Sequence, residues 1–127
     1  MIENIDDYTA DRVIDQMMRD VLTVNVENGW YDDARTFGDD IALIHSEVSE
    51  MLEAYRDHGT IDATDYESYA GGDQPLPKPE GIGSEAADVL IRLLDTCYRY
   101  DISLYNEFAR KLAYNRTRGH KHGGKKL

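Results

Sequence analysis

The sequence has little cysteine, little proline and no long hydrophobic run. Because Cys97 is the only cysteine, an internal disulfide is excluded, and the apolar helical pattern around Cys97 predicts a buried thiol in a reducing compartment. No stretch approaches the roughly 18 apolar residues that suggest a membrane-spanning helix. The acidic residues that follow Met1 do not fit a signal peptide. We therefore expect a cytoplasmic protein without a membrane partner.

Basic residues are also scarce, and they are unevenly placed. The chain has 14 lysines and arginines against 25 acids, a net charge of −11. Seven of the basic residues and none of the acids lie in residues 110–127, so residues 1–109 carry seven basic residues against all 25 acids, a net charge of −18. Such a body repels nucleic acid and anionic lipid. We expect a body that holds cations, a tail that meets anions, and no stable nucleic-acid partner.

The hydrophobic spacing predicts an all-α fold in a single domain, residues 1–127. Apolar residues recur at intervals of three and four in four segments, and nothing alternates with period two for long enough to form a sheet. All three prolines fall in a predicted loop, residues 60–82, and glycines mark a basic tail, residues 119–127. The helices predicted for this four-helix bundle span residues about 8–27, 37–58, 84–100 and 103–118.

Residues suited to cap helices support these bounds. Thr36 or Asp39 is expected to cap the second helix, and Gly59 to end it. Ser84 and Ser103 are expected to cap the third and fourth helices. The short connection between these last two helices predicts that they pack antiparallel.

The second and third helices each have an apolar stripe through which they are expected to pack. The third helix has the wider apolar arc and is predicted to be the most buried. The stripes comprise Ile41, Ile44, Val48, Met51, Leu52 and Tyr55 on the second helix, and Ala86, Val89, Leu90, Leu93, Leu94 and Cys97 on the third. Helices that meet on these stripes would bring the polar residues on their flanks together across a groove.

Two matched pairs of acids lie on those flanks. Glu47 and Glu50 are three residues apart, which is nearly one turn of the second helix. Glu85 and Asp88 repeat this spacing on the third helix. Four carboxylates gathered across a groove supply the hard oxygen ligands that Mg²⁺ or Mn²⁺ prefers. The sequence therefore predicts a divalent metal site built from these four acids.

Acids at this spacing are also common on solvated helix faces, so the spacing alone leaves both interpretations open. The polar gap on the third helix also contains Arg92 and Asp95. Glu53 continues the acidic stripe of the second helix, as an outer ligand or as a base that positions water.

The predicted fourth helix offers a basic counterpart. Lys111, Asn115 and Arg118 lie within about 60° of one another on its wheel, beside an apolar stripe. Lysine and arginine suit phosphate, and an asparagine amide suits a base or sugar edge. Cations near a helix C-terminus are also favoured by the helix dipole, which is the ordinary structural explanation. We expect these three residues to bind the substrate.

Three segments together resemble the MazG-like nucleotide pyrophosphohydrolases: HSEVSEMLEAYRDHG (45–59), KPEGIGSEAADVLIRLLD (78–95) and KLAYNRTRGHKHGGKKL (111–127). The resemblance runs from about residue 30 to the C-terminus. Its centre is an E-x-x-E motif followed by E-x-x-D, matched by Glu47, Glu50, Glu85 and Asp88. Ser46 stands where the family often has a further acid, so any role of that acid is absent here or passes to another residue.

The resemblance implies an all-α homodimer or dimer of dimers. It implies that the four acids bind Mg²⁺, with Mn²⁺ as a substitute, and that Lys111 and Asn115 lie on a substrate-contacting helix. The expected reaction is hydrolysis of an NTP or dNTP between its α- and β-phosphates, giving a monophosphate and pyrophosphate. Glu50 or Glu47 would orient or deprotonate the attacking water, while Lys111 and Arg118 hold the pyrophosphate.

Several alternatives stay open. The chain is also compatible with a dUTPase or dCTPase of the same superfamily, with a phosphoribosyl-ATP pyrophosphatase, or with a catalytically silent module that binds nucleotide or a partner protein. Trp30 and Tyr31 suit base stacking, although core packing or a dimer contact is the favoured explanation. We expect His45 to be a packed or interfacial residue, and His120 and His122 to lie in a solvated tail.

Overall fold

The computed structural model describes residues 6–61, 64–65, 76, 78–120 and 126. These residues form four helices and one short ladder, which confirms the predicted all-α class. The helices are α1 (Asp7–Glu27), α2 (Phe37–His58), α3 (Ile82–Arg99) and α4 (Leu104–Thr117). In the described ranges, no helix combines the length and the hydropathy required to cross a membrane.

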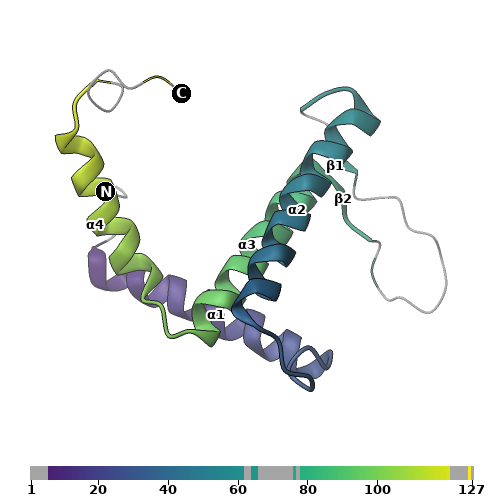
Figure 1. Cartoon of the computed structure of the whole chain (residues 1–127), viewed down its shortest axis with the longest axis horizontal. Coiled ribbons are helices and arrows are strands. Elements are labelled where there is room, and N and C mark those ends of the chain that lie inside the picture. Colours follow the sequence, from purple (N-terminus) through teal and green to yellow (C-terminus); the bar gives the residue numbers. More distant parts are fainter. Residues whose placement is uncertain (1–5, 62–63, 66–75, 77, 121–125, 127) are drawn as a thin grey trace.

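The helices are arranged as two arms joined at a base (Figure 1). Helices α2 and α3 run antiparallel, side by side, as one arm; α1 crosses the base, and α4 forms the other arm. The predicted antiparallel packing of the third and fourth helices is wrong, because α4 packs mainly against α1. The chain turns away after α3 at Asp101, whose φ of 52° is left-handed. The Tyr105 hydroxyl then donates to Asp7 at 2.7 Å, which holds α4 to the start of α1.

The ends of α2 follow the predicted capping chemistry. Thr36 accepts a hydrogen bond from the backbone N–H of Asp39, and the Asp39 side chain accepts one from the N–H of Thr36, a complete capping box. Gly59 ends the helix with a left-handed φ of 71°. Because both ends are fixed locally, the position of each residue along α2 is well determined.

Of the predicted caps of the next two helices, Ser84 is wrong and Ser103 is right in position. Helix α3 begins at Ile82 after Gly81, whose φ is 100°, and Ser84 lies inside the helix with its hydroxyl donating to the carbonyl of Pro79 at 3.1 Å. Ser103 does precede α4, but it makes no capping hydrogen bond. Its hydroxyl instead accepts from the side-chain amide of Asn106 at 2.7 Å.

The predicted loop, residues 60–82, contains a short antiparallel ladder. Strand β1 (Thr64–Asp65) pairs with β2 (Glu80–Gly81), with Thr64 opposite Gly81 and Asp65 opposite Glu80. Residues 62–63, 66–75 and 77 lie outside the described residues. The ladder leads directly into α3 and also contacts it, so it fixes where the first turn of α3 lies relative to the end of α2.

The core lies where α1 crosses α3. Met18, Leu94 and Cys97 are buried there, and Cys97 is only 3% exposed, as predicted. Ile14, Met17, Val21 and Leu104 pack around them. Helix α3 contributes the unbroken buried segment Leu94–Cys97, which confirms that it is the most buried helix.

Helix α2 packs through only part of its apolar stripe. It meets α3 through the side that carries Asp40 and Glu47, which are 3% and 8% exposed. Val48, Leu52 and Tyr55 remain 43–50% exposed, whereas the other three residues of the stripe are half-buried. The expected stripe-to-stripe packing is therefore only partly right, because hydrophobic period identifies an apolar face but not what covers it. Two buried acids lie inside this arm, and one edge of the apolar stripe is open.

Candidate metal centre

Three of the four predicted ligands converge between α2 and α3. Glu47, Glu50 and Glu85 each offer a carboxylate oxygen, and these oxygens lie within 4.8 Å of one another. Glu47 is buried, Glu85 is half-buried and Glu50 is exposed. The three carboxylates converge because the antiparallel packing places the middle of α2 beside the first turns of α3 (Figure 1).

The fourth predicted ligand, Asp88, lies one turn further along α3 and is half-buried. Burial raises its pKa above the ordinary value, and the negative charge of Glu47 raises it further. The positive charges of Arg92 and Lys78 oppose this increase. Asp88 therefore shares the electrostatic field of the other three acids, although it is not part of the group of oxygens within 4.8 Å.

The crowding of these acids changes how Glu85 titrates. Burial raises its pKa, and the neighbouring charges of Glu50 and Asp88 raise it further. A hydrogen bond between the carboxyl groups of Glu85 and Glu50 adds to the shift. Acids held this close disfavour one another's charge unless a cation joins them. The donor set is made of hard oxygens at different depths, so these residues fit Mg²⁺ or Mn²⁺.

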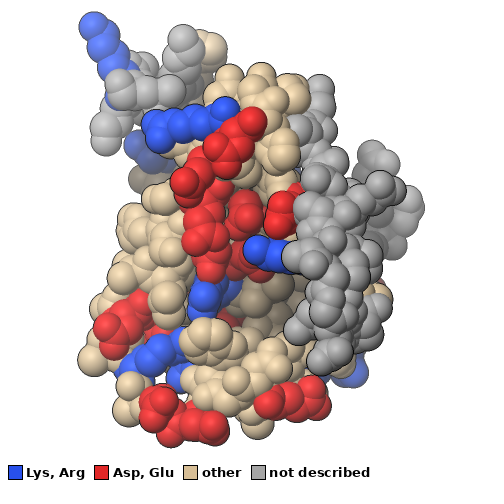
Figure 2. All heavy atoms as spheres, turned by 90° about the vertical axis from the view of Figure 1, so that its right-hand side faces the viewer, with Lys and Arg blue, Asp and Glu red and all other residues tan. Residues whose placement is uncertain are grey.

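Two of these acids, Glu50 and Glu85, line a hollow of about 250 Å³ at the end of α2. Figure 2 shows acidic side chains as a continuous band on this face of the molecule, with basic side chains at its margins. Lys78 forms a loose ion pair with Glu80 at 3.8 Å on the rim. The hollow is lined by Glu50, Glu53, Ala54, Asp57, His58, Lys78, Glu80, Gly81 and Glu85. It has room for a phosphate group beside the clustered carboxylates, and Glu53 faces it as an outer acid.

Arg92 borders the acids about one turn beyond Asp88 on α3, outside the lining of this hollow. Its Nε donates to Oε1 of Glu47 at 2.9 Å. Its guanidinium carbon also lies 5.6 Å from the ring centre of Trp30, within the range of a cation–π contact. Trp30 is 49% exposed, so one aromatic surface is available close to the acid cluster.

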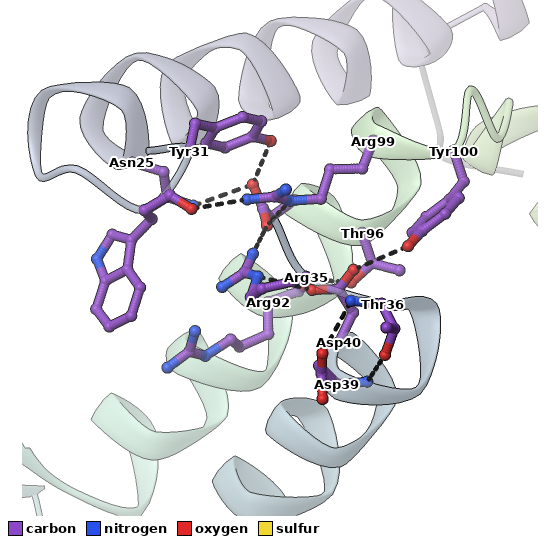
Figure 3. Close-up of polar contacts among 12 residues, drawn as sticks. Asn25, Tyr31, Arg35, Thr36, Asp39, Asp40, Arg92, Thr96, Arg99 and Tyr100 are labelled. Carbon is purple, nitrogen blue, oxygen red and sulfur yellow. Dashed lines mark hydrogen bonds and ion pairs between the residues drawn. The ribbon is translucent and has the colours of Figure 1, made fainter. Parts of the chain in front are cut away.

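A second group of charged residues occupies the same helix pair and was not predicted. Asp95 accepts hydrogen bonds from four side chains: Asn25, Tyr31, Arg35 and Arg99, at 2.7–3.1 Å (Figure 3). These donors lower the pKa of Asp95, although its burial acts in the opposite direction. The carboxylate is therefore held charged and is fully engaged by protein donors.

Arg35 joins Asp95 to a second buried acid, Asp40. The Nε of Arg35 lies 3.1 Å from Oδ1 of Asp40, and the Tyr100 hydroxyl donates to Oδ2 of Asp40 at 3.3 Å. Arg99 stacks on the Tyr31 ring at 3.7 Å and donates to the carbonyl of Trp30 at 3.2 Å. This network fixes the turn between α1 and α2. The sequence held a signal for Asp95 in the polar gap of α3, but none for partners about 60 residues away.

The predicted basic site residues lie elsewhere in the chain. Lys111, Asn115 and Arg118 belong to α4 or its C-cap, on the arm opposite the acids (Figure 1). Lys111 and Arg118 approach the Tyr114 ring at 5.9 and 5.8 Å, and Asn115 is half-buried. The structure of one chain does not bring these residues to the acid cluster.

The remaining residues for which a role was predicted are Tyr31, His45, His120 and His122. Tyr31 is a partner of Asp95, which agrees with the packing explanation given for it. His45 is exposed on α2, so within one chain it is not packed. His120 is exposed, and His122 lies outside the described residues.

Comparison of the chain with protein-family models, with curated proteins and with solved structures gives no match.

Proposed function

We propose that the protein is a Mg²⁺-dependent nucleoside triphosphate pyrophosphohydrolase. It would hydrolyse an NTP or dNTP between the α- and β-phosphates and release a monophosphate and pyrophosphate. The observation that carries this proposal is the convergence of Glu47, Glu50 and Glu85, with Asp88 in the same field. Their order and spacing are also those of the motif through which the sequence resembles MazG-like enzymes.

Each acid has a role that follows from its depth. Glu47, Glu85 and Asp88 are partly or fully buried and are suited to hold the cation in place. Glu50 is exposed beside the hollow, where a water molecule has access, so it is suited to orient or deprotonate the nucleophile. When bound, Mg²⁺ supplies charge neutralisation for the phosphates and lowers the pKa of bound water. The hollow would then hold the phosphate at one end of the triphosphate next to these carboxylates.

A second copy of the chain completes the proposed enzyme. Val48, Leu52 and Tyr55 leave an apolar face open on α2, and exposed apolar patches of this kind mark interfaces. A further apolar groove between α1 and α4 includes Val13 and Phe108. Because α4 is directed away from the acids of its own chain, Lys111, Asn115 and Arg118 would serve the acid cluster of a partner subunit. The proposed assembly is a homodimer or a dimer of dimers.

The test is release of pyrophosphate from the eight standard NTPs and dNTPs, with Mg²⁺ and with EDTA. We expect metal-dependent release of pyrophosphate together with a monophosphate. Glu50→Gln should lower turnover by at least about 100-fold, the usual contribution of a positioned base. Glu27→Gln, an exposed acid at the end of α1, is the matched control and should leave turnover unchanged.

The substrate ranking also separates the alternatives. Turnover confined to dUTP or dCTP would assign a dUTPase or dCTPase of the same chemistry. Mg²⁺-dependent nucleotide binding without turnover would identify a silent binding module and contradict the proposed activity. Equal turnover by wild-type protein and Glu50→Gln would remove the acid cluster from the mechanism.

A further inference from the structure

Arg92 places a positive charge directly on an acid of the candidate metal centre. The Nε of Arg92 lies 2.9 Å from Oε1 of Glu47, and the two side chains are 27% and 10% exposed. An ion pair at this depth is screened by water much less than one at the surface. The charge of Arg92 also counteracts the rise in the pKa of Asp88. Arg92 therefore offsets part of the repulsion within the cluster in the metal-free protein.

The ion pair and a bound cation compete for Glu47. The carboxylate of Glu47 is one of the three that converge within 4.8 Å, and it is also the acceptor for Arg92. A divalent cation held there would repel a guanidinium only a few ångströms away, because like charges at that distance interact strongly in a partly buried site. Occupation of the cluster by metal therefore favours departure of Arg92 from Glu47.

Arg92 has freedom to move that the other arginines nearby lack. Arg35 and Arg99 are bound to Asp95, whereas Arg92 extends away from that network (Figure 3). Within the described residues, the guanidinium of Arg92 makes one ion pair, with Glu47, and one ring contact, with Trp30. The Trp30 ring lies beside the guanidinium, so it offers a surface along which Arg92 can stay close to the acids. A guanidinium released there is partly exposed and suited to bind phosphate oxygens.

We propose that Arg92 is an exchangeable counter-ion: a divalent cation displaces it from Glu47, and the freed guanidinium then binds a phosphate oxygen of the substrate. This inference rests on the proposed function and deepens it. It assigns Arg92 as a phosphate-binding residue within the chain that holds the acids. It also sets an order, since metal binding makes the arginine available before the triphosphate enters.

The test measures two affinities by calorimetry on the intact chain. The first is that of Mn²⁺ for the metal-free protein without phosphate, and the second is that of inorganic pyrophosphate at fixed, saturating Mg²⁺. In Arg92→Gln we expect Mn²⁺ to bind roughly fivefold more tightly, as loss of a competing ion pair predicts. We expect pyrophosphate to bind at least about tenfold more weakly, because a charge-assisted hydrogen bond is lost.

Two further variants keep the result interpretable. Arg12→Gln removes one positive charge from an exposed position on α1 and should change neither affinity. Arg92→Lys keeps the charge but loses the Nε donor, so it should bind Mn²⁺ more tightly than wild type while retaining pyrophosphate affinity within about threefold. Circular dichroism confirms that each variant is folded, and Arg92→Lys still tests the idea where Arg92→Gln does not fold.

The outcomes also separate this inference from the proposed function. Mn²⁺ affinity that is unchanged or weaker in Arg92→Gln would overturn the counter-ion role. Pyrophosphate affinity that is unchanged would overturn the phosphate-binding role. Wild-type protein that binds no Mn²⁺ would instead overturn the metal centre itself, and with it the proposed function.

Discussion

Helices α2 and α3 carry two groups of acids that are built in opposite ways. Around Asp95, four side-chain donors surround one carboxylate, and its pKa is lowered. Around Glu85, carboxylates face one another, and burial and like charge raise its pKa. Asp95 is the more deeply buried of the two, and burial alone would raise its pKa, so the difference comes from their partners and not from their depth.

The comparison distinguishes an acid that supports the fold from the acids of the proposed metal centre. A buried carboxylate that protein donors fully engage has no coordination left for a ligand, and its charge contributes to the fold. Carboxylates left facing one another cost stability, and that cost is relieved when a cation binds. The Asp95 network therefore supports the fold of this arm, and the acid cluster is the part proposed to bind metal. Perturbed acids of this second kind are characteristic of functional sites.

The largest expected decrease in the free energy of unfolding follows from loss of the Asp95 network. Asp95→Ala leaves Arg35 and Arg99 partly buried without their acceptor, and removal of one partner from a buried ion pair typically costs about 3–5 kcal/mol. Urea unfolding followed by circular dichroism measures this change. Glu107→Ala is the matched control, because Glu107 forms an exposed pair with Arg110 at 3.2 Å. The control should cost under about 1 kcal/mol. Equal costs for the two variants would contradict the structural role of Asp95.

A smaller change in the free energy of unfolding is expected when Mg²⁺ binds to the acid cluster. Mg²⁺ at one hundred times its dissociation constant should raise the free energy of unfolding by about 2.7 kcal/mol relative to EDTA. Thermal melts with and without Mg²⁺ measure this difference. The double variant Glu50→Gln with Glu85→Gln should lose it, while Asp33→Asn, an exposed acid in the α1–α2 turn, should keep it.

The stabilisation of the fold by Mg²⁺ should decrease as the pH is lowered. Glu85 and Asp88 have raised pKa values, so they take up protons at a higher pH than ordinary carboxylates and then compete with Mg²⁺. The lowered pKa of Asp95 keeps the neighbouring network charged over this range. Stabilisation by Mg²⁺ that is constant from neutral pH down to the ordinary range of carboxylates would show that these acids are not its ligands.

The smallest expected change in the free energy of unfolding is that of the metal-free protein. Glu85→Gln removes one of the facing charges and should stabilise the fold by about 0.5 kcal/mol at neutral pH, the scale of a partly exposed charge pair. Because the pKa of Glu85 is raised, its charged form is the destabilising one, so the advantage of the variant should vanish as pH falls through that pKa. Denaturation at two pH values in EDTA measures this. A variant that is less stable than wild type at neutral pH would show that the cluster is not under repulsion.

Local chemistry made the helices and the acid motif predictable. The capping box of Thr36 and the left-handed Gly59 are decided by neighbours in sequence, and α2 lies where these signals place it. The acids converge because their positions along two antiparallel helices are fixed in the same way. The expected reason was only partly right, however: the side of α2 that meets α3 carries two buried acids, and half of the apolar stripe stays exposed.

What the sequence did not reveal depends on contacts between distant residues. Arg35 and Asp95 are 60 positions apart, and no periodic pattern links an arginine in a turn to an aspartate in a helix. The direction of α4 depends on a left-handed residue, Asp101, and on the hydrogen bond between Tyr105 and Asp7. Patterns of period 3.6 state which face of a helix is apolar, but its neighbour is decided by the whole chain.

The position of Trp30 has a practical consequence. It is the only tryptophan in the sequence, and its ring lies 5.6 Å from the guanidinium carbon of Arg92. Indole emission therefore arises from a single place in the molecule, next to the acid cluster and held by the Arg99 hydrogen bond to its own backbone carbonyl. The chain thus contains its own optical probe, and occupancy of the neighbouring site becomes observable in unlabelled protein.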